Sequence, residues 1–227
     1  MVLAAKIFEI KIPTNLEEIA EKLKDFKRVD EEEVEGRKFE LHMTVDNLDM
    51  DDNYVTGNFN RDKIIFVNQR GNTVPILKTV TARIYIHRYG EKLLLTVLQK
   101  KHFANSVASI LSNHLFLTYR GVVEARIPPE NMREYHDRNP EATKVIYFDS
   151  LDFVGVDKVA LYGDSLRATG KYEEYLSHGK IWYIVFTVRD SNVVLGLTRN
   201  CVVTSFSKMP ENEFMGYIIR EVFPMIE

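Results

Sequence analysis

Cysteine is nearly absent from this sequence. Cys201 is the only cysteine among 227 residues, so no disulfide can form within the chain and no cysteine-based zinc site is available. Because Val202 and Val203 follow it, we expect Cys201 to be a small buried apolar residue. Glutamine is also scarce, while lysine and glutamate are plentiful, which is a balance similar to that of thermophile proteins.

Long hydrophobic runs are missing as well. No apolar segment approaches the length of a membrane span, and no basic stretch followed by an apolar one begins the chain. We therefore expect a cytoplasmic protein without a membrane partner. The net charge is −3, from 30 basic and 33 acidic residues, so the overall charge does not indicate a polyanion-binding protein. With 45% hydrophobic residues, the chain can bury a sizeable core.

The order of hydrophobic patterns predicts an α+β protein. Residues 6–12 alternate between polar and apolar side chains, as in a half-buried strand. Asn15 and Glu18 form a capping-box-like pair at the start of a helix with an apolar face. The acidic run at residues 30–33 is interpreted as a solvated turn.

Further strands and helices are predicted along the rest of the chain. In the first half, we expect strands at 39–45, 54–59, 64–67, 81–89 and 92–98, with a polar turn after 59, a hairpin turn at Gly90-Glu91 and a helix over 103–115. In the second half, we expect strands at 121–127, 144–149, 156–162, 181–188 and 192–197, a short helix from about 130 to near 139, and a last helix that contains Phe214 and Val222.

Three short segments match between the two halves, in the same order. Residues 9–13 match 124–128, each just before a predicted helix. Residues 45–50 (VDNLDM) match 148–153 (FDSLDF), and residues 93–95 match 193–195. A repeat of about a hundred residues indicates a duplicated domain rather than a solenoid. The predicted domains are residues 1–118 and 119–227, although two unrelated α+β halves that share common patterns remain the alternative.

Each predicted repeat has an antiparallel sheet with helices packed on one face. This layout resembles the TATA-binding-protein-like fold, in which two such repeats form a saddle with the helices on its convex side. The resemblance covers nearly the whole chain but is architectural, because no sequence motif of that family is present. It implies a binding surface on the concave sheet face, for nucleic acid or for other partners.

Strand alternation assigns a set of side chains to the helix-free face. The candidate binding residues are Lys11, Glu40, His42, Arg83, Tyr85, His87, Arg126 and Tyr183, together with the carboxylates of Glu9 and Glu124. Phosphates would be repelled by these carboxylates, and apolar wedges for base steps are missing. The sequence therefore predicts a non-catalytic binding or regulatory protein whose partner, a protein or a nucleic acid, is undecided. A solvated face without a partner and a homodimer that covers it both remain open.

An enzyme is the competing hypothesis. It would place a small-molecule site at the junction of the halves, with His42, His87, Arg83 and Glu40 as candidates. Residues 163–166 (GDSL) resemble the serine block of the GDSL hydrolases, but His178 alone follows and no Asp-x-x-His block is present.

Metal and cofactor sites lack support in the sequence. Asp49, Asp51 and Asn53 resemble the first ligands of a calcium loop, yet Tyr54 and Asn60 replace its glycine and its terminal glutamate. We interpret these acidic residues as turn caps. No P-loop or GxGxxG motif is present, so no cofactor is predicted.

Overall fold

The fold is α+β and its strands pair antiparallel. The computed structural model describes residues 3–138, 140–164, 166–188 and 191–227, and within them it contains five α-helices and twelve strands. The chain divides into two compact units: an N-terminal unit of Glu9–Val123, and a C-terminal unit of Glu124–Glu227 with the residues up to Phe8. The α+β class expected from the sequence is confirmed.

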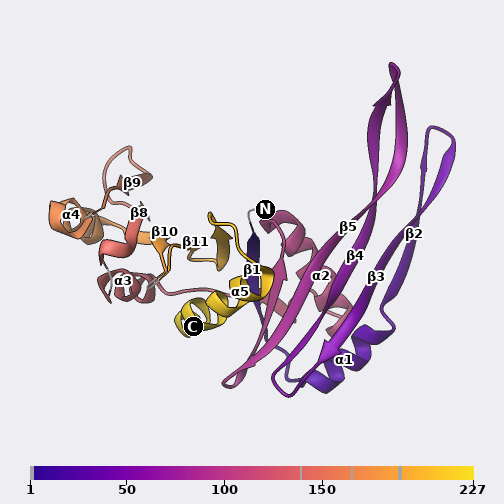
Figure 1. The fold of residues 1–227 in the computed structure, drawn as a ribbon, viewed down its shortest axis with the longest axis horizontal. Coiled ribbons are helices and arrows are strands. Elements are labelled where there is room, and N and C mark those ends of the chain that lie inside the picture. Colours follow the sequence, from indigo (N-terminus) through magenta and orange to yellow (C-terminus); the bar gives the residue numbers. More distant parts are fainter. Residues whose placement is uncertain (1–2, 139, 165, 189–190) are drawn as a thin grey trace. The chain divides into compact units, whose positions relative to one another are not determined.

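The N-terminal unit contains a sheet in the order β2-β3-β4-β5-β6, accompanied by two helices (Figure 1). Its elements are α1 (Leu16–Lys24), β2 (Lys27–Val34), β3 (Arg37–Met50), β4 (Tyr54–Gln69), β5 (Asn72–Tyr89), β6 (Lys92–Leu98) and α2 (Lys101–Phe116). Neighbouring strands in this order are consecutive in the chain, so the sheet is an antiparallel meander.

Helices α1 and α2 cover one face of this sheet. Phe59 of β4 lies 5.9 Å from Phe26 and 6.4 Å from Phe103, between ring centroids. On the same face, Arg61 donates to the Ser106 hydroxyl of α2 at 2.8 Å. The predicted start of α1 is confirmed, because the side chain of its N-cap Asn15 accepts from the Glu18 amide.

Two predictions for this unit are wrong. The acidic run at residues 30–33, interpreted as a turn, lies inside strand β2 and pairs with residues 38–41 of β3. The strands expected at 54–59 and 64–67 are one continuous strand, β4, and β5 begins at Asn72 instead of residue 81. Cross-strand hydrogen bonds stabilise extended backbone whatever the side chains, so polar stretches that pattern alone assigns to turns can remain in strands.

The strands of the C-terminal unit follow one another in the sheet in the order β1-β12-β11-β10-β8-β9. Its strands are β1 (Ala4–Ile10), β8 (Thr143–Asp149), β9 (Lys158–Tyr162), β10 (Lys180–Thr187), β11 (Val194–Thr198) and β12 (Val202–Ser205), and the short strand β7 (Val122–Glu124) leads into the unit. Its helices are α3 (Pro129–Arg138), α4 (Lys171–His178) and α5 (Glu211–Tyr217). A π-helical turn (Ile218–Val222) and short 3₁₀ turns (Pro140–Ala142, Leu166–Thr169 and Phe223–Met225) complete it.

Aromatic residues join the helices of this unit to one face of its sheet. Tyr135 of α3 packs edge-on against Phe186 of β10 with 4.7 Å between the ring centroids. Tyr172 of α4, a helix that the sequence analysis did not predict, lies 6.2 Å from Phe148 of β8. Since Phe148, Phe186 and Tyr172 are buried, this face is the core of the unit.

A buried lysine lies next to the single cysteine. Lys6 is fully buried and forms an ion pair with Glu124. Cys201 is also buried, as expected, and its carbonyl accepts from the Ile7 amide at 3.0 Å. Burial raises the pKa of the Cys201 thiol, which is only partly opposed by the Lys6 charge. The thiol is therefore protonated at neutral pH, which makes it an inert core residue.

The end of β3 contains a close approach between a leucine and a glycine. Asn47 has a positive φ of 49°, and the β3–β4 register shifts between Asp46 and Asp49. A Cβ atom built on Gly57 of β4 would lie 3.0 Å from Leu48 Cδ2 and 3.2 Å from the Asp46 carbonyl oxygen. Only glycine allows Leu48 to lie this close to β4 without displacement.

The end of β8 repeats this arrangement in the C-terminal unit. Ser150 has a positive φ of 53°. A Cβ atom on Gly179, just before β10, would lie 2.6 Å from Leu151 Cδ2 and 2.9 Å from the Asp149 carbonyl oxygen. The two segments are those that match in the sequence (VDNLDM and FDSLDF), so sequence and local geometry agree at these positions.

The Gly179 contact yields a stability prediction. We expect Gly179→Ala to lower the free energy of unfolding by about 1–3 kcal/mol, because its methyl group overlaps Leu151 and a backbone oxygen. Gly216→Ala is the matched control: its Cβ meets only Arg220 Nη1 at 3.5 Å, so removing a helical glycine should raise stability by roughly 0.5–1 kcal/mol. Urea denaturation measures both, and equal stability of the two variants would contradict the packing described.

Candidate binding surface

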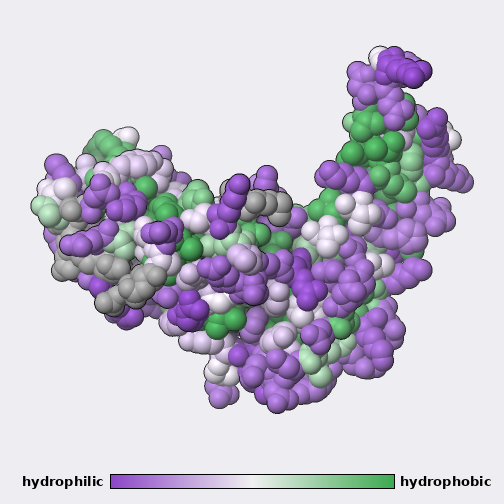
Figure 2. Space-filling model, viewed as in Figure 1, coloured by the Kyte–Doolittle hydropathy of each residue, from purple (hydrophilic) through white to green (hydrophobic). Residues whose placement is uncertain are grey.

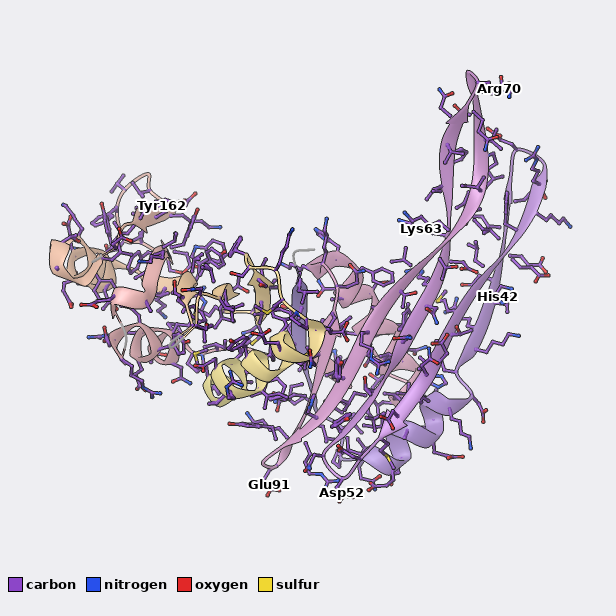
Figure 3. The ribbon with its side chains drawn as sticks, viewed as in Figure 1. His42, Asp52, Lys63, Arg70, Glu91 and Tyr162 are labelled. Carbon is purple, nitrogen blue, oxygen red and sulfur yellow. The ribbon has the colours of Figure 1, made fainter. Side chains whose placement is uncertain are left out.

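Three tyrosines lie together on the sheet of the C-terminal unit. Tyr147, Tyr162 and Tyr183 come from β8, β9 and β10, respectively. The ring centroid of Tyr147 lies 6.1 Å from that of Tyr162 and 5.5 Å from that of Tyr183, and both pairs are edge-to-face. Figure 3 labels Tyr162 on β9. Its side chain is exposed, at 67%.

The pleat of the sheet directs these rings away from the helices. Tyr147 lies between Ile146 and Phe148, which are buried on the helix-covered face, and successive side chains of a strand point to opposite faces. A register shift between Ile181 and Tyr183 adds Trp182 to the group. We call Tyr147, Tyr162, Trp182 and Tyr183 the tyrosine face.

Gly196 of β11 provides space for the Tyr183 ring. A Cβ atom at this position would overlap the Tyr183 hydroxyl, and it would lie 2.9 Å from Phe206 Cε2. Phe206 is itself 53% exposed. The Tyr183 ring therefore lies directly over the backbone of β11, with an exposed phenylalanine beside it.

Two phenols of the tyrosine face, those of Tyr162 and Tyr183, have a raised pKa. The hydroxyl groups of Tyr147 and Tyr162 share a hydrogen bond, and this bond is the main reason that the pKa of Tyr162 is raised. Burial raises the pKa of Tyr183, with smaller contributions from Tyr147 and Tyr162. At neutral pH Tyr162 and Tyr183 therefore carry no phenolate charge that would repel an anionic ligand.

Basic side chains border the tyrosine face. Lys158 Nζ lies 4.9 Å from the centroid of the Trp182 ring, within cation–π distance. Arg199 donates to both carboxylate oxygens of Asp149, at 3.0 and 2.6 Å. Asp149 is opposite Lys158 in the register, so this ion pair compensates a negative charge beside Lys158.

Among the predicted residues, the structure brings Arg83, Tyr85 and His87 together on β5 of the N-terminal unit. The Arg83 guanidinium lies 5.6 Å from the Tyr85 ring, which stacks on His87 at 5.9 Å. Tyr54 of β4 lies 5.4 Å from His87. Arg83 also donates to Asn58 Oδ1 at 3.2 Å. Burial lowers the pKa of His87, so its imidazole is neutral at pH 7.

Glu40 and His42 form a separate group on β3. Their side chains approach to 3.5 Å, and the His42 amide donates to Asp62 Oδ2 at 3.1 Å. His87 is opposite Tyr54 in the register, eight positions from Asp62 along β4. At about 3.3 Å per residue, this separation is roughly 26 Å. His42 and His87 therefore do not converge.

Lys11 and Arg126 lie on loops, just after β1 and β7, respectively. Lys11 pairs with Glu9 at 2.7 Å, and Arg126 is exposed after β7, where its carbonyl accepts from the Glu227 amide at 3.1 Å. Glu124 is the partner of Lys6. Of the eight candidate binding residues, only Tyr183 belongs to the tyrosine face.

The sequence analysis missed the other members of the tyrosine face. Tyr147 and Tyr162 lie at alternating positions of correctly predicted strands, which was a usable signal. Trp182 gave no such signal, because its orientation results from the bulge in β10.

The acidic turn after β3 is explained by backbone capping. Asp51 Oδ1 accepts from the amides of Asn53 at 2.7 Å and Tyr54 at 2.9 Å, so this turn cap is confirmed. Within the described residues, no group of three His, Cys, Asp or Glu side chains could hold a metal ion.

The structure describes the GDSL segment only in part. Ser165 lies outside the described residues. The neighbouring Asp164 pairs with Lys144 at 2.8 Å, which lowers the pKa of its carboxyl group. His178 pairs instead with Asp152, at 2.7 Å.

A small cavity is present elsewhere in the C-terminal unit. It has a volume of about 170 Å³ and is lined by Tyr135, Arg138, Ala142, Thr143, Phe186, Thr187 and Glu221. Cavities that bind small organic ligands usually measure about 300–1,000 Å³. Across the described part of the chain, no helix combines the length and apolar character needed to cross a bilayer.

The shared hydroxyl contact can be tested by titration. We expect Tyr147→Phe to lower the pKa of Tyr162 toward the ordinary value, because it removes the bond that stabilises the neutral phenol. NMR of ¹³Cζ-labelled tyrosine measures this shift. Tyr119→Phe, at a tyrosine that is 69% exposed, is the control and should leave Tyr162 unchanged. An unaltered Tyr162 pKa in Tyr147→Phe would contradict the contact.

Comparison with known proteins does not identify a family. No family model matches the chain, and no curated protein is similar to it in sequence. What the molecule binds is therefore inferred from its own surfaces.

Proposed function

We propose that this protein is a non-catalytic binding protein that engages single-stranded nucleic acid through the tyrosine face. The observation that carries the proposal is the group of tyrosines on the helix-free side of the C-terminal sheet, with the exposed Tyr162 at its border. Partly exposed aromatic rings on a sheet are a common surface for the stacking of unpaired bases.

The spacing of the rings suits a base-stacking surface. Tyr147, Tyr162, Trp182 and Tyr183 have neighbouring centroids 5.5–6.1 Å apart. Each base that stacks on an aromatic side chain contributes about 1–3 kcal/mol, largely independent of sequence. Unpaired bases present such faces, whereas a duplex keeps its bases stacked internally.

The charges near the tyrosine face also favour an anionic ligand. Lys158 and Lys180 are exposed, and Asp149 is neutralised by Arg199. The carboxylates that argued against phosphate binding do not belong to the tyrosine face. Glu9 and Glu40 are in the N-terminal unit, and Glu124 of the C-terminal unit forms the ion pair with Lys6. A phosphate backbone that follows the strand of bases would gain contacts with the two lysines.

Duplication remains part of the proposal, with local support. Asp46, Leu48 and Gly57 make the same close approach as Asp149, Leu151 and Gly179. Both segments also have a residue with positive φ at the equivalent position. A tandem TATA-binding-protein-like ancestry would explain why both units have a sheet with helices packed on one face.

Nucleic-acid binding is tested by fluorescence anisotropy with labelled single-stranded DNA and RNA of about twelve nucleotides. We expect Tyr162→Ala to weaken binding roughly 5- to 150-fold, from the loss of one stacked base. Lys158→Ala should weaken binding to all sequences and reduce the slope of log K against log salt by about 0.7. Tyr119→Ala is the control and should bind as the wild type does.

Three results would reject the proposal. One is the absence of measurable binding at low salt for every single strand tested. The second is an affinity that Tyr162→Ala and Lys158→Ala leave unchanged, and the third is a duplex that binds as tightly as the matching single strand. The first would favour a protein partner, for which exposed tyrosine and tryptophan are also suitable contacts.

A further inference from the structure

Two hairpins of the N-terminal unit extend beyond the part of the sheet in which β3 pairs with β4 and β5 pairs with β6. The pairing of β3 with β4 ends at Met43 and Arg61, and the pairing of β5 with β6 starts only at Arg83. We call residues 62–80 of β4 and β5 the arm, and residues 27–42 of β2 and β3 the acidic hairpin. Both hairpins are visible in Figure 1.

The arm has apolar side chains on both faces. Its cross-strand pairs place Ile64 opposite Leu77 and Phe66 opposite Pro75 on one face; the pairs on the other face are Ile65 with Ile76 and Val67 with Val74. Phe66 is 56% exposed and Leu77 45%. Figure 2 shows this hydrophobic surface below a hydrophilic tip. An isolated two-stranded ribbon is marginally stable in water, so these side chains indicate a partner.

Like charges lie directly opposite one another in both hairpins. In the arm, Lys63 is opposite Lys78, whereas in the acidic hairpin Glu31 is opposite Glu40. Such pairs destabilise a ribbon. Among the described residues, no carboxylate forms an ion pair with either lysine, and no basic group forms one with Glu31.

The two hairpins are complementary in charge and in apolar character. The arm has three basic residues and one acidic residue, and the acidic hairpin has six acidic and four basic residues. On the face of the acidic hairpin that includes Glu31 and Glu40, Val29 is 43% exposed. On the face of the arm that includes Lys63 and Lys78, Ile65 and Ile76 follow the lysines.

We propose that the partner is a second copy of this chain. The arm of each copy lies against the acidic hairpin of the other, with Lys63 and Lys78 beside Glu31 and Glu40. The faces that contain Phe66 pack against each other at the twofold axis. One isologous interface then satisfies both like-charge pairs and buries both apolar faces of the arm.

A nucleic acid explains these observations less well. Phosphates would be attracted to the lysines of the arm but repelled by the carboxylates of the neighbouring hairpin. They would also leave Phe66 and Leu77 in water. A second copy supplies carboxylates and apolar side chains together, so the homotypic pairing is favoured. This proposal does not depend on the tyrosine face, which belongs to the other unit.

Charge reversal provides the test, with mass in solution as the measurement. Sedimentation equilibrium of the wild type should give twice the chain mass of 26.4 kDa. Lys63→Glu/Lys78→Glu and Glu31→Lys/Glu40→Lys should each dissociate at least tenfold more readily, because each homodimer would bring like charges together. An equimolar mixture of the two variants should recover the dimer, since both arm–hairpin contacts are then between opposite charges.

Control variants separate this interface from general effects. Lys100→Glu/Lys101→Glu reverses two exposed lysines outside the hairpins and should dimerise as the wild type does. Phe66→Asp should weaken the dimer at high salt as well as at low salt, because its contact is apolar. Recovery by mixing shows that both charge variants are folded, and circular dichroism checks the fold of Phe66→Asp.

Three outcomes would overturn the proposal. The first is a wild type that remains monomeric at about 100 μM. The second is a mixture of charge variants that is no more dimeric than either variant alone. The third is a monomeric wild type whose arm binds a nucleic acid in a manner abolished by Lys63→Glu/Lys78→Glu, which would assign the arm to nucleic acid.

Discussion

In each unit, helices bury one side of the paired strands, and this burial determines which side chains face outward. In the C-terminal unit, Phe148 and Phe186 contact aromatic side chains of α3 and α4, so the intervening positions of β8 and β10 face away from the core. Because successive side chains of a pleated strand point to opposite faces except at the bulge in β10, burial of one set directs the other set outward. Tyr147 and Tyr183 belong to that outward set, and the surface they form is a consequence of how the core packs.

The same constraint has a different result in the N-terminal unit. There, Ala82, Ile84 and Ile86 of β5 are buried, but the strand continues into the arm, where paired backbone persists without a helix beneath it. On one face of the arm Phe66 and Leu77 are then exposed, and on the other face Ile65 and Ile76 are only half-buried. An isolated two-stranded ribbon is marginally stable in water, so the proposed association would stabilise the arm. The tyrosine face differs, because its rings lie on a packed layer.

Much of the fold could be predicted from local patterns. Alternation identified the strands at residues 144–149 and 181–188, and Asn15 with Glu18 marked the start of α1. These features depend on nearest neighbours in the chain, so the sequence contains the necessary information. The acidic strand β2, the unbroken length of β4 and helix α4 were missed, because cross-strand pairing and packing against Phe148 stabilise segments whose own patterns are weak.

The sequence alone determined the secondary-structure class, the outward orientation of Tyr183 and the likeness of the segments around Leu48 and Leu151. Only the tertiary structure decided which side chains meet. His42 and His87, both on the predicted helix-free face, are separated by the register of β4. Tyr147, Tyr162 and Tyr183 are brought together because β8 lies between β10 and β9 in the strand order. Strand order and register are set by long-range hydrogen bonds and by a bulge, and these leave little trace in the local alternation of residues.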